Sequence, residues 1–291
     1  MIPERKVLLV VNPISGGISK DDIFEIAINR SKTEAFDLRI YQTSGKDDAS
    51  HIKNLVETLM PERVIVAGGD GTIGMAASAI TGKHIILGII PAGSANGLSV
   101  DFGIPSDFKQ AMDIAFRNKF MEMDAILING EISLHLSDIG LNALLIKNYE
   151  KGDSRGKIGY AKEMIKTLNE HNNFDVRIEA NGQVLETEAL IVIVANGSKY
   201  GTGVNINPLG SITDGKFEII VSKKLDFIET AKILTGNTDY NPEVMRIISA
   251  REATISCTNG HAHFQMDGEY KGEIQEIKVS VVSKYMKVAV P

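Results

Sequence analysis

The first third of the chain alternates strand-like runs with stretches of helical periodicity. The runs Lys6–Asn12, Phe36–Tyr41, Arg63–Ala67 and Ile85–Ile90 predict strands. Apolar spacing, acidic helix starts and a stop at Pro61 predict helices at Asp21–Ser31, Lys46–Met60, Ile73–Ile80 and Phe108–Phe116. This alternation favours an α/β domain with a parallel sheet that has helices on both faces.

From about Asp124 the pattern becomes rich in strands. We expect strands at Asp124–Ile128, Phe174–Ala180, Leu190–Ala195, Phe217–Val221, Arg246–Cys257, His263–Met266 and Ile277–Val282. Hairpin signals separate them at Asn129-Gly130, Asn181-Gly182, Asp214-Gly215 and Asn259-Gly260. Two helices, Lys157–Asn169 and Asp226–Leu234, are predicted between strands. The second part is therefore predicted to be a mainly antiparallel β domain.

A length of 291 residues suggests about two domains. We place the first at residues 1–123 and the second at residues 124–283, with a return of the C-terminal tail, about 284–291, to the first domain as an option. The boundary has no linker-like composition, so we expect the domains to pack closely.

Composition narrows the class of protein. The formal net charge of -6 argues against a nucleic-acid partner. Cys257 is the only cysteine, which excludes an internal disulfide and fits a reducing compartment. The N-terminus lacks the features of a signal peptide, and the longest apolar runs, Ile85–Ile90 and Ala189–Ala195, are far below the ~18 residues that span a bilayer. We therefore expect a cytoplasmic protein without a transmembrane segment, whose contact with a membrane is peripheral.

The sharpest chemical signal is the loop Gly68–Thr72. It follows a predicted strand directly and opens a predicted helix. Its glycines let the backbone approach a ligand, and the helix start offers N–H groups and a positive dipole end to phosphate. Asp70 could orient a metal or accept a proton. An ordinary tight turn is the alternative, and three glycines around an acid disfavour it.

Two further loops end neighbouring strands of the predicted sheet. Pro91–Gly97 carries Ser94 and Asn96, and Asn12–Gly17 follows the first strand. Taken alone, either could be an ordinary loop. Because loops at the carboxyl ends of parallel strands converge on one crevice, the three together predict a nucleotide site.

These motifs resemble the catalytic domain of diacylglycerol kinases, sphingosine kinases and their bacterial lipid-kinase relatives. The resemblance is carried by Asn-Pro-x-Ser-Gly from Asn12, Gly-Gly-Asp-Gly-Thr from Gly68 and Pro-x-Gly-Ser-x-Asn from Pro91. It continues through Arg155–Tyr160, Ala195–Gly197, Asp214–Phe217 and Asp267–Glu269. It implies an N-terminal α/β domain that binds nucleotide, a C-terminal β-sandwich domain that takes the lipid, and an active site in the cleft between them.

The resemblance also implies residue roles. ATP would be held by Asn12, Ser15, Gly16, Thr43, Gly68, Gly69, Asp70, Gly71, Thr72, Gly93, Ser94, Asn96, Arg155 and Glu269. Asp267 resembles the general base, with Glu269 as its acidic companion near the nucleotide and Asp70 as the competing base. Mg²⁺ held by Asp70 would neutralise charge on the phosphates, and Asp214 resembles part of a second metal site. In isolation, Asp267–Glu269 would be a simple hairpin turn.

The predicted activity is transfer of the γ-phosphoryl group of ATP to a hydroxyl of a diacylglycerol-like or sphingosine-like lipid, presented at a membrane surface or in micelles. A kinase of the NAD-kinase type is one alternative, because such enzymes share the Gly-Gly-Asp-Gly-Thr element. An inactive nucleotide- or lipid-binding protein of the same fold is another, because Gly97 stands where many relatives have Asp. Asp138 would be the substitute for an acid that recognises an amino-lipid head group. The sequence leaves the oligomeric state open, a homodimer included.

Overall fold

The computed structural model describes residues 5–94, 96–151, 173–200, 204–224 and 241–291. Arg155 and the predicted helices Lys157–Asn169 and Asp226–Leu234 lie outside the described residues. The chain divides into two compact units. Met1–Asp124 and Ser283–Pro291 belong to the first unit, and Ala125–Tyr200 and Val204–Val282 belong to the second.

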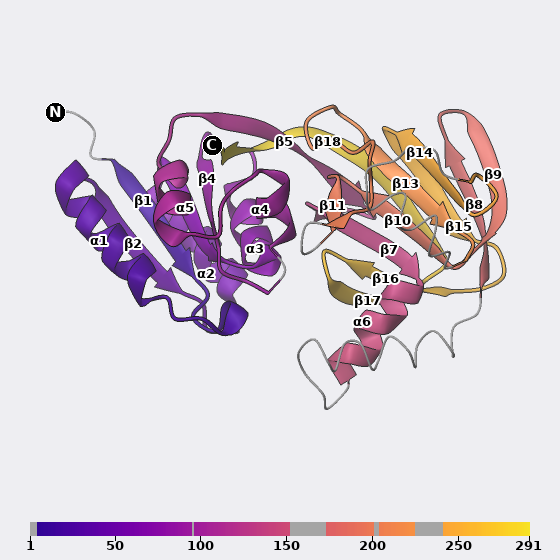
Figure 1. Ribbon diagram of the computed structural model, residues 1–291, viewed down its shortest axis with the longest axis horizontal. Helices are drawn as coiled ribbons and strands as arrows, with labels where there is room; N and C mark the ends of the chain where they lie inside the picture. The colour runs from indigo at the N-terminus through magenta and orange to yellow at the C-terminus, as the bar shows by residue number, and fades with distance from the viewer. Residues whose placement is uncertain (1–4, 95, 152–172, 201–203, 225–240) are drawn as a thin grey trace. The chain divides into compact units, whose positions relative to one another are not determined.

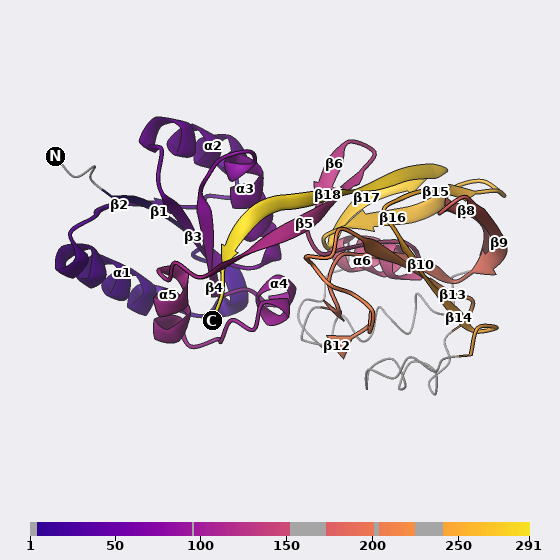
Figure 2. The same cartoon turned by 90° about the horizontal axis from the view of Figure 1, so that it is seen from above.

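The first unit is built on a parallel sheet with the strand order β2-β1-β3-β4-β18. Its strands are β1 (Lys6–Val11), β2 (Asp37–Gln42), β3 (Arg63–Gly68), β4 (Ile86–Pro91) and the end of β18 (Glu276–Ala289). The helices α1 (Asp21–Glu34) and α5 (Phe108–Ala115) lie on one face, and α2 (Asp48–Leu59) and α3 (Asp70–Ile80) lie on the other (Figure 1, Figure 2).

The burial of the strands follows from this layering. Every residue of β3 is buried, and so is every residue of β1 and β4 after the first, because helices cover both faces of a parallel sheet. The edge strand β2 instead has only exposed and half-buried positions. The β-branched runs of the sequence therefore form the centre of the sheet.

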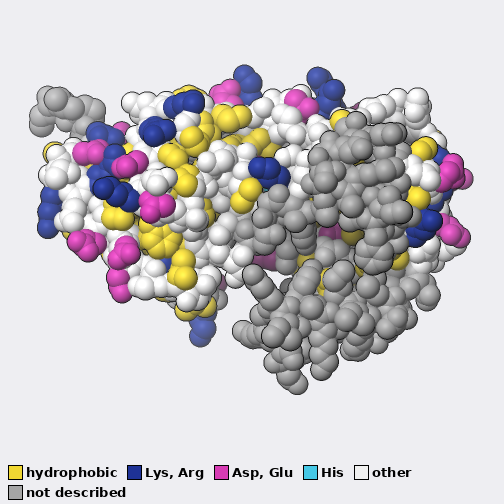
Figure 3. Space-filling view, viewed as in Figure 1, with side chains coloured by type: hydrophobic (Ala, Val, Ile, Leu, Met, Phe, Trp, Pro, Cys, Tyr) yellow, Lys and Arg dark blue, Asp and Glu magenta, His cyan; other side chains and the backbone are white. Residues whose placement is uncertain are grey.

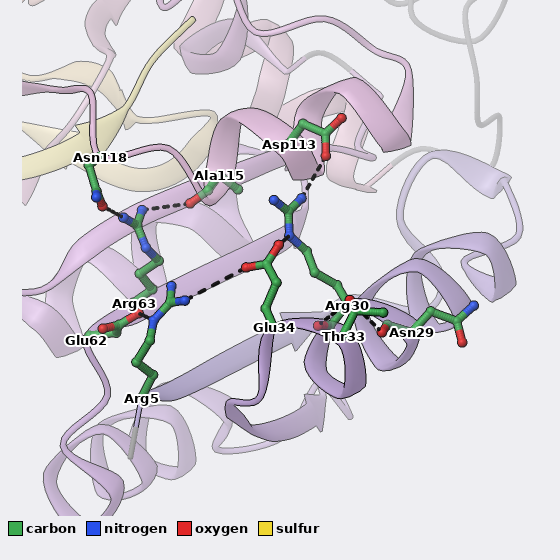
Figure 4. A network of polar contacts seen from close by, with 10 residues as sticks. All are labelled: Arg5, Asn29, Arg30, Thr33, Glu34, Glu62, Arg63, Asp113, Ala115 and Asn118. Atoms are coloured by element: carbon green, nitrogen blue, oxygen red, sulfur yellow. Dashed lines mark hydrogen bonds and ion pairs between the residues drawn. The ribbon is translucent and has the colours of Figure 1, made fainter. Parts of the chain in front are cut away.

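A polar network lies at the start of these strands (Figure 4). Arg63, the first residue of β3, is 3% exposed and donates hydrogen bonds to the carbonyl of Ala115 at 2.8 Å and to Asn118 Oδ1 at 2.7 Å. Burial lowers the pKa of Arg63 below its usual value. Arg30 forms ion pairs with Glu34 at 2.6 Å and with Asp113 at 2.7 Å, which connects α1 to α5.

The second unit is an antiparallel β-sandwich. One sheet has the order β9-β8-β15-β18, and the other has the order β14-β13-β10-β7-β16-β17. The strands are β7 (Leu136–Gly140), β8 (Phe174–Ala180), β9 (Gln183–Ala189), β10 (Ile191–Ala195), β13 (Phe217–Ser222), β14 (Met245–Ala250), β15 (Glu252–Cys257), β16 (Ala262–Met266) and β17 (Glu269–Ile274). Side chains of both sheets, such as Ile255 and Phe217, fill one core between them.

Smaller elements complete the second unit. A hairpin of β5 (Phe120–Ile128) and β6 (Glu131–Ser133) extends the first of these sheets by pairing with β18. The helix α6 (Leu141–Lys151) packs on β7, β16 and β17, and β11 (Lys199–Tyr200) pairs with β12 (Val204–Asn205). None of the described helices is long and apolar enough to cross a bilayer.

The predicted fold class is confirmed: an N-terminal α/β unit with a parallel sheet and a C-terminal, mainly antiparallel β-sandwich. One predicted strand, Arg246–Cys257, is wrong as a single element. It forms β14 and β15, which belong to different sheets of the sandwich. The chain turns at the exposed Arg251, whose carbonyl accepts the N–H of Val281 at 2.9 Å.

Candidate functional site

Three loops meet at the carboxyl edge of the parallel sheet: the loops after β1, β3 and β4. The loop after β1 contains a short 3₁₀ turn, Ser15–Gly17, and the loop after β4 leads into the short helix α4 (Gly97–Asp101). Asn12 Nδ2 donates to Thr72 Oγ1 at 3.3 Å, which joins the first loop to the start of α3. The Ala92 N–H donates to the Gly68 carbonyl at 3.0 Å, which joins the loop after β4 to the loop after β3. The structure thus brings together the loops that the sequence singled out.

The close approach of these loops explains two of their glycines. Gly16 has a φ of 63°, and a Cβ there would lie 2.7 Å from the Ala92 carbonyl oxygen. A Cβ on Gly93 would lie 2.4 Å from the Cα of Gly69. Neither position has room for a side chain, so the backbones form a surface that a ligand can approach closely.

Asp70 fastens the loop after β3 to the loop after β4. Its Oδ2 accepts the N–H of Gly97 at 2.9 Å, and its Oδ1 accepts the N–H of Leu98 at 3.2 Å. Both donors belong to the start of α4. Each carboxylate oxygen accepts one of these two bonds and keeps lone-pair capacity for a further donor or a cation.

The polar side chains Asn96 and Asn12 also form hydrogen bonds within their own loops. Asn96 has a left-handed backbone with a φ of 56°, accepts the N–H of Gly93 at 2.8 Å and donates to the Gly93 carbonyl at 2.9 Å. Asn12 Oδ1 accepts the N–H of Ile14 at 3.2 Å. Ser94, in contrast, is exposed at the tip of its loop.

The loop after β1 is braced by a lysine that sequence reasoning missed. Lys20 is 4% exposed, and its Nζ donates to the carbonyls of Ser15 and Ile18 at 2.7 Å each. Burial lowers its pKa below the usual value. The available signal was a cation close behind the Ser-Gly-Gly turn.

The loop after β2 contains Thr43, which is 9% exposed, and is closed by Asp48. Asp48 accepts hydrogen bonds from the Tyr41 hydroxyl and from the N–H groups of Ser44 and Gly45, at 2.7, 2.8 and 2.7 Å. Burial pushes the pKa of Asp48 up, but these bonds outweigh it and hold the pKa below its usual value. Burial, together with the hydrogen bond to Asp48, raises the pKa of Tyr41 to about 12.

The edge formed by the three loops fits the phosphates of ATP. Gly69, the N-cap of α3, has no side chain that could accept the first N–H groups of the helix. Uncapped helix starts bind phosphate through these groups and the helix dipole. Gly16 and Gly93 let the loop backbones lie in direct contact, because a Cβ at either position would overlap backbone atoms of a neighbouring loop.

The predicted catalytic carboxylates Asp267 and Glu269 lie in the second unit. Asp267-Gly268 is the two-residue turn between β16 and β17, with φ angles of 49° and 88°. Positive φ at both positions is the pattern of a type I′ hairpin. The Glu269 side chain is 72% exposed and forms an ion pair with Lys271 at 3.5 Å.

The carboxylate of Asp267 is surrounded by donors. It accepts the N–H groups of Leu134, His135 and Leu136 at 2.8, 3.0 and 3.0 Å, and the Ser133 hydroxyl at 2.9 Å. The donors belong to the end of β6, the start of β7 and the two residues between these strands. Asp267 is therefore a major attachment of the turn to the neighbouring strands.

A buried carboxyl lies on the other side of the same turn. Asp138 and Gln265 are each 1% exposed, and Gln265 Nε2 donates to Asp138 Oδ2. Asn142 Nδ2 also donates to Asp138 Oδ2, at 2.5 Å. Burial raises the pKa of Asp138 to about 7, although its hydrogen bonds oppose the shift.

Metal binding stays a prediction for both acids named for it. Asp214 Oδ1 accepts the N–H of Lys216 at 3.1 Å. Within the described ranges, no three His, Cys, Asp or Glu side chains gather as a metal site would require.

Comparison with known families divides the chain in two. Residues 6–128 match the model of the diacylglycerol kinase catalytic domain. Residues 138–290 match the model of the YegS C-terminal NAD kinase beta sandwich-like domain.

Named relatives match nearly the whole chain. The "Diacylglycerol kinase" of Staphylococcus carnosus (strain TM300) is 26% identical over 93% of this chain and 90% of its own length. The "Probable lipid kinase YegS-like" of Klebsiella pneumoniae (strain 342) is 25% identical over 90% of this chain and 88% of its own length. A solved structure from Bacillus anthracis str. Sterne, described as a "putative diacylglycerol kinase", superposes with a TM-score of 0.79 at 25% identity, over 100% of this chain and 99% of that one.

Proposed function

Because this chain belongs to the family that joins a diacylglycerol kinase catalytic domain to a YegS C-terminal NAD kinase beta sandwich-like domain, we propose that it is a lipid kinase. The reaction is transfer of the γ-phosphoryl group of ATP to a lipid hydroxyl. The observation that carries the proposal is the meeting of three glycine-bearing loops at one edge of the sheet, at which Gly69 and Gly93 have no room for a side chain between them.

The first unit binds the nucleotide in this account. The N–H groups at the start of α3 and the backbone around Gly93 take the phosphates, because donors fixed in place need no reorganisation when negative charge develops. Asp70 keeps these loops in register through the start of α4 and has lone-pair capacity for Mg²⁺. When bound, Mg²⁺ neutralises charge on the phosphates.

The second unit provides two carboxylates, Asp267 and Glu269. The attacking hydroxyl must lose its proton, and a carboxylate within hydrogen-bond reach is a suitable acceptor. Asp267, Glu269 and Asp70 are the candidates, and their surroundings differ. Asp267 accepts hydrogen bonds from four donors and Asp70 from two, whereas the exposed Glu269 forms an ion pair with Lys271.

The acceptor is a diacylglycerol-like or sphingosine-like lipid presented at a membrane surface or in micelles. The loop after β1 exposes Ile14 and Ile18, with 85% and 47% of their surfaces accessible, and such side chains gain from contact with an apolar phase. On the face shown in Figure 3, acidic and basic side chains of the first unit are interspersed, with hydrophobic side chains among them. A surface of this kind suits transient contact at an interface better than strong electrostatic adhesion.

The experiment is phosphoryl transfer from γ-labelled ATP with Mg²⁺ to lipids in mixed micelles. The panel contains diacylglycerol, monoacylglycerol, phosphatidylglycerol, sphingosine and ceramide, with NAD as the water-soluble acceptor. A labelled lipid supports the proposal and identifies the acceptor. Labelled NAD with unlabelled lipids would instead support the NAD-kinase alternative.

A nucleotide-binding protein without transferase activity is the second candidate. The observation in its favour is that Asp70 uses both carboxylate oxygens to hold α4, where Gly97 supplies only a backbone N–H. This candidate predicts that ATP binds and that no acceptor becomes labelled.

A further inference from the structure

The side chain of Lys20 is enclosed behind the loop after β1. Lys20 is 4% exposed, whereas Gly16, Gly17 and Ile18 of the same loop are exposed. Lysine is almost never fully buried unless its charge is paired. The burial of this ammonium group therefore calls for a partner that carries negative charge.

The two acceptors of the Lys20 ammonium group are neutral. Nζ donates to the carbonyls of Ser15 and Ile18 at 2.7 Å each. Carbonyl dipoles solvate an ammonium group, but they do not cancel its charge, and a charge removed from water without a counter-charge is costly. These hydrogen bonds explain how the loop holds Lys20 without explaining what balances it.

Nearby acids do not supply the missing charge. Within the described part of the chain, no carboxylate forms an ion pair with Lys20. Asp21 and Asp22 follow it in the sequence, but both are exposed in the first turn of α1, and Asp21 Oδ2 accepts the Ser19 hydroxyl at 2.8 Å. Burial lowers the pKa of Lys20, and no acid raises it again. The positive charge is thus unbalanced among the described residues.

Lys20 also sets the direction of the peptide between Ser15 and Gly16. In a trans peptide the N–H points opposite to the carbonyl, and no peptide bond of the described residues is cis. Since the Ser15 carbonyl faces Lys20 Nζ, the Gly16 N–H faces away from the lysine. The loop therefore presents a main-chain donor on the side opposite to the buried charge.

This loop lies against the other two loops of the site. A Cβ on Gly16 would be 2.7 Å from the Ala92 carbonyl oxygen, and Asn12 Nδ2 donates to Thr72 Oγ1 at 3.3 Å. Lys20 is therefore close to the edge at which the proposed function places the phosphates. Attraction between an ammonium group and a phosphate acts at a distance in a poorly solvated site and needs no direct contact.

We propose that Lys20 is a positioning residue for the nucleotide, which holds the loop after β1 from behind and whose charge is balanced by the phosphates of ATP. The inference rests on the ATP-dependent function proposed above and adds a residue to it. A neutral donor would hold the two carbonyls equally well, but it would not attract the phosphates. The charge and the hydrogen bonds of Lys20 can therefore be tested separately.

Three substitutions separate the two contributions. Lys20→Gln keeps an NH₂ donor for the carbonyls and removes the charge, Lys20→Met removes both, and Lys20→Arg keeps both. Lys53→Met is the matched control, because Lys53 is exposed within α2 and its loss changes the net charge by the same amount. Each full-length protein is titrated by calorimetry with adenosine, AMP, ADP and ATP at one Mg²⁺ concentration, and its midpoint of urea unfolding is measured.

The loss of affinity is expected to depend on the phosphate groups of the ligand. Lys20→Gln and Lys20→Met should raise the Kd of ATP about 10–100-fold, because each removes a unit charge that attracts the phosphates. The Kd of adenosine should stay within about twofold of the wild-type value, since adenosine carries no charge for the lysine to attract. Lys20→Gln should unfold at a urea concentration closer to that of the wild type than Lys20→Met does, because its NH₂ group still donates to a carbonyl. Lys20→Arg should keep ATP affinity within about threefold, as it retains the charge, and Lys53→Met should match the wild type.

Two results would overturn the proposal. The first is a Lys20→Gln protein with the wild-type Kd for ATP, which would show that the hydrogen bonds alone account for the lysine. The second is an equal loss of affinity for adenosine and ATP, which would mean that the substitution distorts the loop. If Lys20→Met does not fold, Lys20→Gln and Lys20→Arg carry the comparison. Wild-type protein that binds no nucleotide would instead sink the ATP-dependent function itself.

Discussion

Replacement of Gly93 by alanine tests the contact between the loop after β3 and the loop after β4. The new Cβ would lie 2.4 Å from Gly69 Cα and 2.9 Å from both Gly69 N and Asn96 Oδ1. Ordinary van der Waals contact begins at 3.4 Å, so the two backbones must separate by about 1 Å. Overpacking of this kind costs about 1–3 kcal/mol of folding stability. A displacement of about 1 Å in a site that positions reactants can lower activity about 100-fold.

The assay combines urea unfolding, ATP binding by titration calorimetry and the initial rate of phosphoryl transfer. Gly74→Ala is the matched control, because Gly74 lies within α3 and a Cβ there has nothing within 4 Å. The control should gain up to about 1 kcal/mol from helix propensity and bind ATP as the wild type does. A Gly93→Ala protein with wild-type stability and ATP affinity would refute the close approach of the loops.

Three further predictions concern buried charges. Arg63→Met should lower the free energy of unfolding by about 1–3 kcal/mol in urea, because it leaves the Ala115 carbonyl without the guanidinium donor. Asp48→Asn should cost about 1–3 kcal/mol at pH 7. The pKa of Asp48 is lowered in the folded protein, so the ionised carboxylate stabilises the fold above pH 3.8, and this stabilisation is lost as pH falls through the lowered pKa. In thermal unfolding, the difference in Tm between Asp48→Asn and the wild type should therefore become smaller as pH falls through that range. Asp138→Asn should behave oppositely: the folded pKa is raised to about 7, so the contribution of the acid is full below 3.8 and is lost as pH rises through about 7. The Tm of Asp138→Asn relative to that of the wild type should therefore rise as pH increases from about 4 to about 7. A Tm difference that stays constant over this range would contradict the prediction.

The fold class followed from patterns that act over short distances. Arg63–Ala67 and Ile85–Ile90 are β-branched runs bounded by Pro or Gly, and they form the fully covered centre of the parallel sheet. The loops after these strands could be placed together, since carboxyl ends of parallel strands share an edge. The meeting of the three loops was thus within reach of sequence reasoning.

The segment Arg246–Cys257 shows what sequence pattern conceals. Its apolar alternation continues through the point where the chain passes from β14 to β15, and no Gly or Pro marks the corner at Arg251. The partner of each half decides the break, because β14 pairs with β13 and β15 pairs with β18. Strand pairing of this kind is tertiary information.

The surroundings of Asp267 were equally out of reach. Its main-chain donors include Leu134, 133 residues earlier in the chain, and a main-chain N–H carries no residue-type signal. The sequence indicates an Asp-Gly turn with an acid after it. Only the fold reveals that one acid is enclosed by donors while Glu269 is exposed.

The most direct test of the central claim is the stoichiometry of transfer. Wild-type protein, ATP, Mg²⁺ and the lipid that becomes labelled in the panel are incubated, and ADP, inorganic phosphate and the phosphate ester of the lipid are quantified together by ³¹P NMR. The account predicts one lipid phosphate monoester for each ADP, with no matching release of inorganic phosphate. ADP accompanied by an equal amount of inorganic phosphate, or bound ATP that stays intact, would contradict it.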